Sequence, residues 1–199
     1  MIYAGTIDIP NAIKRKHFYE GYTETDIAND IKKEIEFSEF HGTRPDRLII
    51  ISAVGGLNES FKDGDIVVIR DLITLTYKST YRGASFVDMS KPIDKRLAKA
   101  VFDKYPSVRN GIHAFMRGPH YETFEDKLVL KRLGADVVGM STTPEVIVAN
   151  RLGIPCIALG LVTNLAFVKH SHEEVKKEVE KAMPRVKEMA EYLENYELE

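Results

Sequence analysis

The sequence contains little of what would mark a disulfide-stabilised or metal-binding protein. Of its 199 residues, one is cysteine and none is tryptophan. A single cysteine cannot form a disulfide within the chain, and the cysteine–histidine spacing of zinc sites is absent, so we expect no metal. Because Cys156 lies inside the apolar segment 154–162, we expect it to be a buried and inert thiol.

An excess of one charge and long apolar stretches are absent as well. The chain has 28 basic and 30 acidic residues, which gives a net charge of −2 and no basic surface of the kind that binds nucleic acid. No apolar run approaches the ~20 residues of a membrane span. The first residues, MIYAGTIDIPN, lack the pattern of a signal peptide. We therefore expect a cytoplasmic protein with no nucleic-acid or membrane partner.

Strand-like apolar segments alternate with amphipathic ones along the chain. This alternation predicts an α/β fold with a central mixed, largely parallel sheet flanked by helices, in a single domain over residues 1–199. Pro184 should kink or divide the last helix. The expected strands are 47–54, 65–77, 111–116, 135–140 and 154–162, and the expected helices, several opened by a capping signal, are 23–40, 91–105, 123–134, 142–153 and 171–196.

Ligands of α/β sheets gather where strands turn into loops or helices. The glycine-rich segment 52–56 could present bare backbone N–H groups to an anion, although glycine turns after strands are common. Ser141 precedes a predicted helix, so its hydroxyl could bind phosphate with the helix N-terminus; capping by Ser141, Thr142 or Thr143 is the alternative. Arg15 and His17 could contact phosphate or relay a proton, or form a solvated basic turn.

Three side chains at other strand ends have groups that suit a flat heterocycle. Tyr121 can stack on a ring, and Glu122 can accept from ring N–H groups, unless it only stabilises the first turn of a helix. Asn164 has a donor and an acceptor, which could read a ring edge or stabilise a turn. His172 lies in the first turn of the last helix, where a neutral imidazole is expected; it could donate to a sugar hydroxyl or face solvent.

The chain resembles the trimeric purine nucleoside phosphorylases of the nucleoside phosphorylase superfamily. The resemblance covers about residues 15–190, and GPHYET together with GADVVGMSTTPEV is its most specific part. The matching segments are RKHFYEGY (15–22), SAVGGLNESFKDGDIVVIRDLI (52–73), GPHYET (118–123), LGADVVGMSTTPEVIVANRLGIP (133–155), VTN (162–164) and HEEV (172–175).

The resemblance implies reversible phosphorolysis, in which a purine nucleoside and phosphate give the free base and ribose 1-phosphate. Inorganic phosphate would be the co-substrate, with no metal or organic cofactor, and purine salvage would be the role. The implied oligomer is a homotrimer or a multiple of it. The implied phosphate contacts are Arg15, His17, the backbone at Ala53 and the hydroxyl of Ser141.

The remaining implied contacts are with the nucleoside. Tyr19 and Met140 would lie beside the ribose, and His172 near its 5′-hydroxyl. Tyr121 would pack against the purine, with Glu122 holding N1–H and Asn164 stabilising N7 as negative charge develops. Asn164, Glu122 and His17 would thus be the catalytic residues. Because adenine has no N–H at N1, a carboxylate at 122 favours inosine and guanosine.

The chain departs from the family in its first residues and in one loop. Residues 1–13 contain no Gly-Ser-Gly phosphate loop, so we expect an N-terminally shortened member. Segment 81–90, the region that in the family gives an aromatic side chain to the neighbouring subunit, is short and contains Phe86. Two alternatives therefore stay open: a nucleoside- or purine-binding homologue with impaired catalysis, and an enzyme like the methylthioadenosine phosphorylases. The latter typically have serine and aspartate at the positions of Glu122 and Asn164.

Overall fold

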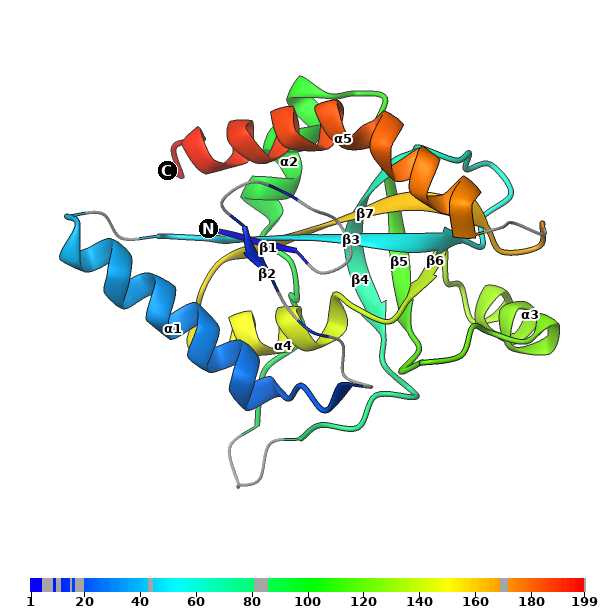
Figure 1. Cartoon of the computed structure of the whole chain (residues 1–199), viewed down its shortest axis with the longest axis horizontal. Coiled ribbons are helices and arrows are strands. Elements are labelled where there is room, and N and C mark those ends of the chain that lie inside the picture. Colours follow the sequence, from blue (N-terminus) through cyan, green and yellow to red (C-terminus); the bar gives the residue numbers. More distant parts are fainter. Residues whose placement is uncertain are drawn as a thin grey trace.

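The computed structural model describes residues 1–4, 9, 12–14, 16, 20–42, 45–80, 86–168 and 172–198, except for the side chains at 3, 4, 172 and 174–176. Within these ranges the chain forms a seven-stranded sheet with helices packed around it (Figure 1). The strands are β1 (Ile2–Ala4), β2 (Ile13–Lys14), β3 (Leu48–Gly56), β4 (Ile66–Ile73), β5 (Arg109–Phe115), β6 (Val137–Gly139) and β7 (Cys156–Leu165). The helices are α1 (Glu24–Phe40), α2 (Lys95–Lys104), α3 (Phe124–Arg132), α4 (Thr143–Leu152) and α5 (His172–Asn195).

The sheet order is β2-β1-β3-β6-β5-β4-β7, and β7 also pairs with β3. Five strands, β3, β6, β5, β4 and β7, therefore close into a barrel, and β1 and β2 extend from it. The pairs β1–β2, β1–β3, β3–β7, β4–β5 and β5–β6 are parallel, whereas β3–β6 and β4–β7 are antiparallel. The prediction of a mixed, largely parallel sheet with flanking helices is confirmed, and the closure is an additional finding.

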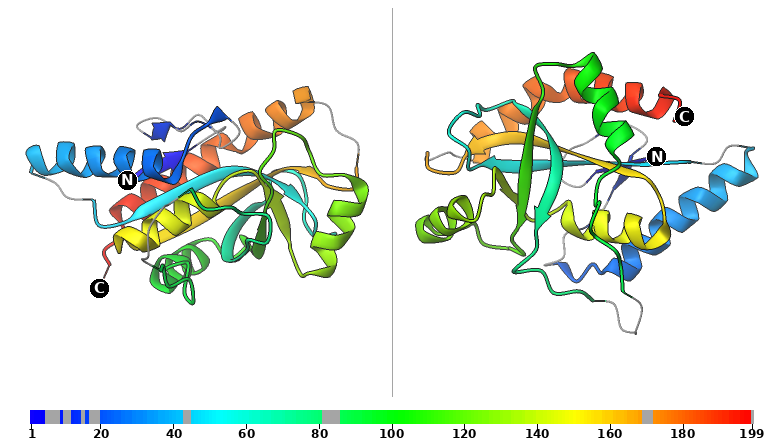
Figure 2. Two further views of the ribbon diagram at one scale, coloured as in Figure 1. Left: turned by 90° about the horizontal axis from the view of Figure 1, so that it is seen from below. Right: turned by 180° about the vertical axis from the view of Figure 1, so that it is seen from behind.

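Helices cover the barrel on opposite sides (Figures 1 and 2). On one side, α2 and α5 pack on the face of β3, β4 and β7 that carries Ile49, Val68 and Leu159. On the other side, α1 contributes Ile27 and Ile31, and α4 contributes Val146 and Ala149, to a core that they share with residues of the barrel strands. Helix α3 packs at the end of the barrel through Leu130. None of the helices within the described ranges is long and apolar enough to cross a membrane.

Helix starts follow the capping signals in two of the predicted cases. Thr23 and Thr123 each form a capping box with the aspartate three residues later, Asp26 and Asp126. Thr142 occupies the N-cap position of α4 but makes no capping hydrogen bond, so that interpretation of its hydroxyl is wrong. Helix α5 continues across Pro184, so the proline does not divide it.

Candidate active site

The candidate site begins where β6 crosses the end of β3. Gly55 of β3 is paired with Val138 of β6 and, on the other side, with Asn164 of β7. A Cβ atom on Gly55 would lie 3.7 Å from the Asn164 amide nitrogen Nδ2, and one on Gly139 would lie 3.4 Å from the carbonyl oxygen of Ala53. A Cβ atom on Gly55 would make only ordinary contacts, whereas the absence of a side chain at Gly139 lets β6 approach its neighbours closely. As a result, Ala53, Gly139 and Asn164 are close neighbours.

The loop after β5 runs from this crossing toward the end of β7. Its first backbone N–H, at Met116, donates to the carbonyl of Gly139 at 2.9 Å. At its far end, the ring of Phe124 contacts the ring of Phe167, with centroids 5.9 Å apart. Between these two anchors the loop presents Tyr121, which is 74% exposed, and the half-buried Glu122. Burial raises the pKa of the Glu122 carboxyl above its ordinary value.

The segment between β6 and α4 contains Ser141, one of the residues predicted to bind phosphate. Met140 is half-buried, and Ser141 is 4% exposed. Thr142 follows with a φ of 76° and a ψ of −57°, and its Oγ1 shares a 2.7 Å hydrogen bond with Ser52 Oγ of β3. The structure therefore brings Ala53, Met140, Ser141 and Asn164 together around the ends of β3, β6 and β7. Their predicted roles in binding stay predictions.

A buried histidine that the sequence analysis did not select lies beneath this crossing. His113 of β5 is fully buried, and its Nε2 would be 3.0 Å from a Cβ atom on Gly139. Burial lowers its pKa to about 3, so the imidazole is neutral at neutral pH. Neither ring nitrogen has a hydrogen-bond partner in the part of the chain that the structure describes. The only sequence signal was one polar ring inside the apolar segment 111–116.

Four of the predicted residues cannot be placed in this site. Arg15, His17 and Tyr19 lie outside the described residues. His172 is the first residue of α5, but its side chain is also outside what the structure describes. Their predicted contacts with phosphate, ribose and the 5′-hydroxyl are therefore untested by the geometry.

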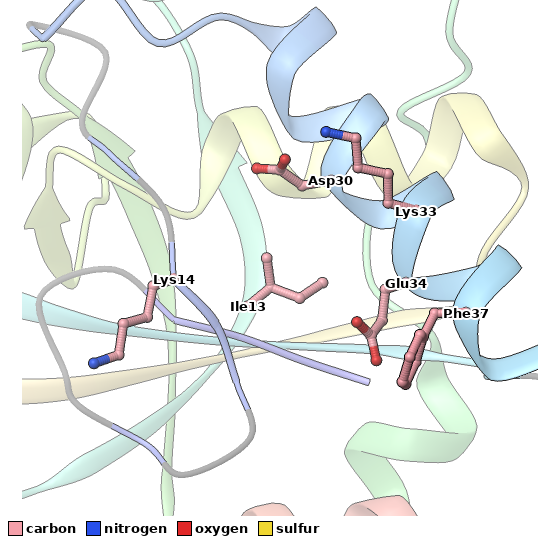
Figure 3. Close-up of a pocket in the computed structure, with 6 residues that line it drawn as sticks. All are labelled: Ile13, Lys14, Asp30, Lys33, Glu34 and Phe37. Atoms are coloured by element: carbon pink, nitrogen blue, oxygen red, sulfur yellow. The ribbon is translucent and has the colours of Figure 1, made fainter. Parts of the chain in front are cut away.

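A pocket of about 460 Å³ lies between β2 and α1 and contains none of the predicted site residues (Figure 3). Its lining residues are Ile13, Lys14, Asp30, Lys33, Glu34 and Phe37. Over the described ranges, no three histidine, cysteine, aspartate or glutamate side chains are grouped so that they could hold a metal ion.

Comparison with known sequences gives a consistent set of relatives. Residues 17–193 match the family described as the phosphorylase superfamily. The chain is 35% identical over 176 residues to a purine nucleoside phosphorylase of Cellulomonas sp, covering 86% of this chain and 60% of that protein. It is 33% identical over 182 residues to purine nucleoside phosphorylase 1 of Bacillus subtilis (strain 168), covering 84% and 65% of the two. The chain thus spans about 60% of the length of such curated relatives.

Solved structures give the same result for the fold. Isoform 2 of purine nucleoside phosphorylase from Schistosoma mansoni, in complex with cytosine and ribose-1-phosphate, superposes with a TM-score of 0.79 at 31% identity. The Schistosoma mansoni purine nucleoside phosphorylase in complex with inosine gives a TM-score of 0.79 at 30% identity. Each comparison covers 93% of this chain and 71% of the other. Every described residue of the candidate site lies inside the matched range 17–193.

Proposed function

The chain belongs to the phosphorylase superfamily, and on this basis we propose that it catalyses the phosphorolysis of purine nucleosides. The observation that carries the proposal is the meeting of Ala53, Met140, Ser141 and Asn164 where β3, β6 and β7 approach one another. Strand ends that lie this close together allow a nucleophile site and a base site to be adjacent. The relatives and structures named above as purine nucleoside phosphorylases support the same reaction.

In the proposed base site, Tyr121 covers the purine ring while Glu122 and Asn164 read its edge. Cleavage of the glycosidic bond leaves the sugar electron-poor and transfers an electron pair to the purine. The amide of Asn164 can donate to N7, where that charge accumulates, and a Glu122 carboxylate can accept from N1–H. Glu122 is half-buried, so solvent competes less for its carboxylate. This strengthens the attraction between the carboxylate and an N–H at N1, and it also raises the cost of placing a ring nitrogen without a proton there.

The same carboxylate gives the proposed substrate class, 6-oxopurine nucleosides. Inosine and guanosine present an N–H at N1, whereas adenosine presents an unprotonated ring nitrogen that would face an acceptor. A half-buried acceptor without a donor costs about 1–3 kcal/mol, so adenosine should be the poorer substrate. Equal turnover of adenosine and inosine would contradict this assignment and favour an enzyme like the methylthioadenosine phosphorylases.

In the proposed phosphate site, the hydroxyl of Ser141 and the backbone at Ala53 hold inorganic phosphate, the second substrate. Arg15 and His17 would complete it, with His17 available to donate a proton to the phosphate. Holding the phosphate next to the sugar makes its attack on the ribosyl carbon effectively intramolecular. Met140 borders the proposed ribose site, to which we also assign Tyr19 and His172. The chemistry requires no metal or organic cofactor.

The proposed oligomer is a homo-oligomer, with a trimer as the expected state. Phe86 is fully exposed, and Tyr121 and Phe124 are mostly exposed beside the proposed base site. Exposed aromatic side chains next to a ligand site are typical of surfaces that a partner covers. A second copy of the chain could therefore complete the wall of the purine pocket.

The first experiment measures hypoxanthine release from inosine with and without phosphate. We expect release only with phosphate, and a loss of at least about 100-fold in kcat/KM for Glu122→Ala and Asn164→Ala, because each removes a contact that strengthens as the bond breaks. Glu125→Ala and Asn110→Ala are matched controls, since both residues are exposed and neither has a proposed role in the site. If inosine binds but phosphate never supports its cleavage, the chain is a binding protein instead.

A further inference from the structure

Thr142 adopts a backbone conformation that a threonine avoids. Its φ of 76° makes it the one residue other than glycine with a positive φ in the described ranges. With a ψ of −57°, and with the N–H of Thr143 donating to the carbonyl of Ser141 at 2.9 Å, it is the centre of a γ-turn of the rare, strained hand. A β-branched side chain makes this conformation especially unfavourable. Such strain persists only where the surrounding structure enforces it.

The enforcing contact comes from the neighbouring strand β3. Ser52 Oγ and Thr142 Oγ1 share a 2.7 Å hydrogen bond, and the two side chains are 2% and 0% exposed. Ser52 itself is fixed, because β3 is paired with β7 along its whole length. On the other side of the turn, α4 starts at Thr143 and is anchored in the core by Val146 and Ala149. The turn is therefore held at both ends.

The strained turn decides where the preceding residue points. Ser141 is buried, and in the part of the chain that the structure describes no hydrogen bond of its hydroxyl is found. Ser141 precedes Thr142 in the chain, and Ala53 follows Ser52. Thr142 and Ser52 are the two residues whose hydroxyls bond to each other. The Ser52–Thr142 hydrogen bond thus links the turn that carries Ser141 to the strand that carries Ala53, the backbone group proposed to meet the same anion.

We infer that Ser52 is a positioning residue for the nucleophile site: its hydroxyl holds Thr142 in the strained turn, which presents the Ser141 hydroxyl to phosphate. The inference rests on the proposed function, because phosphate is the ligand proposed for Ser141. It adds that Ser52 and Thr142 act on phosphate through the position of Ser141, so that they set the affinity for phosphate and leave the affinity for the nucleoside unchanged.

A double-mutant cycle tests this arrangement. Ser52→Ala and Thr142→Val each remove one hydroxyl at nearly constant volume, so each should raise the KM for phosphate about tenfold, the order expected for one buried hydrogen bond. The KM for inosine should change less than about twofold. The double variant should be no worse than either single variant, because both remove the same interaction. Ser52→Thr, which keeps the hydroxyl, should restore a phosphate KM close to that of the parent chain.

Two further variants separate positioning from general loss of stability. Cys156→Ala destabilises β7 near its pairing with Leu48, at the other end of β3, and should leave the phosphate KM unchanged. Thr142→Gly also lacks the hydroxyl, but glycine adopts a φ of 76° without strain. Thr142→Gly should therefore raise the phosphate KM less than Thr142→Val does, even if Ser52→Ala folds poorly.

The outcomes distinguish this inference from the function on which it rests. If the parent chain shows no phosphate-dependent cleavage, the proposed function fails and the inference fails with it. If the parent chain is active but Ser52→Ala shifts both KM values equally, or the effects of the two single variants add, Ser52 has only a structural role. Equal effects of Thr142→Gly and Thr142→Val would also overturn the inference.

Discussion

The imidazole of His113 gives the protein a built-in sensitivity to acid. Burial lowers its pKa from 6.5 to about 3, so the unfolded chain binds a proton below pH 6.5 while the folded chain does not. The unfolded state therefore gains relative stability as the pH falls from 6.5 toward 3. At pH 5 the contribution is about 2 kcal/mol, from 1.5 pH units at about 1.36 kcal/mol each. Chemical denaturation at pH 7.5 and pH 5 should show this loss in the free energy of unfolding.

A variant without the imidazole isolates that effect. His113→Phe keeps an aromatic ring of similar size, so its free energy of unfolding should fall less between pH 7.5 and pH 5 than that of the parent chain. The exposed His41 provides the control, and His41→Ala should retain the full pH dependence. Identical pH profiles for the parent chain and His113→Phe would show that His113 does not titrate differently in the two states.

Gly139 leaves room for the His113 imidazole at the point where β6 approaches β3. A Cβ atom there would lie 3.0 Å from His113 Nε2 and 3.4 Å from the Ala53 carbonyl oxygen, so Gly139→Ala overpacks the site. We expect a loss of about 1–3 kcal/mol in the free energy of unfolding and a higher KM for inosine. Gly55→Ala, whose Cβ would meet no atom closer than 3.4 Å, is the milder control. A Gly139→Ala variant as stable as the parent chain would contradict this account.

The sequence predicted some of these residues and missed others for a physical reason. Ser141 and Asn164 follow the predicted strands 135–140 and 154–162, so their residue type and their position in the sequence were enough to select them. The strain at Thr142 and the location of His113 depend on which strands cross. That information lies in contacts between distant segments, and a local pattern does not contain it.

At the scale of elements, the buried carboxylate of Glu24 ties α1 to the segment after β4. Its oxygens accept from the hydroxyls of Tyr77 at 2.5 Å, Ser79 at 2.7 Å and Thr80 at 2.9 Å, and from the backbone N–H of Thr80. Glu24→Gln replaces one acceptor oxygen by a donor that faces other donors. We expect a loss of about 2 kcal/mol in the free energy of unfolding, and faster hydrogen exchange over residues 77–80.

The matched control for this prediction lies on the same helix. Glu36 is exposed, so Glu36→Gln should change neither the stability nor the exchange of residues 77–80. If Glu24→Gln leaves that segment as protected as before, the carboxylate is not what holds it.

Element prediction succeeded where signals are local. Capping threonines marked the starts of α1 and α3, and apolar runs marked β3 and β7. Strands β1 and β2 were missed because they have three and two residues, too few for a periodic pattern. The predicted strand 65–77 ends at Ile73, and the chain that follows turns toward α1, where the Tyr77 hydroxyl donates to Glu24.

At the scale of the whole molecule, the proposed oligomer predicts a role in activity for Phe86, whose side chain is fully exposed in a single chain. A fully exposed side chain can be replaced without loss of stability in a monomer. If a second copy covers it, Phe86→Ser should weaken association or raise the KM for inosine about tenfold. Sedimentation and steady-state kinetics measure the two effects. Phe40→Ser, at the exposed end of α1, is the control, and a monomeric, fully active parent chain would refute the proposal.

The class of the fold was predictable, but its closure was not. Alternating strands and helices indicate a mixed, largely parallel sheet whether that sheet is open or closed. Closure depends on the antiparallel pairs β3–β6 and β4–β7, which join segments far apart in the sequence. The same pairs determine which strand ends meet, so the complete site could not be derived from the order of elements alone.

The pairing of β3 with β7 has a consequence for how the protein is made. Leu48 of β3 lies opposite Cys156 of β7, so the two partners come from opposite halves of the chain. During synthesis, the apolar residues Ile49, Ile50 and Ile51 leave the ribosome long before their partners do. An unpaired apolar strand is prone to association with other chains. A nascent chain stalled before β7 should therefore bind chaperones, and release should coincide with the emergence of residue 165.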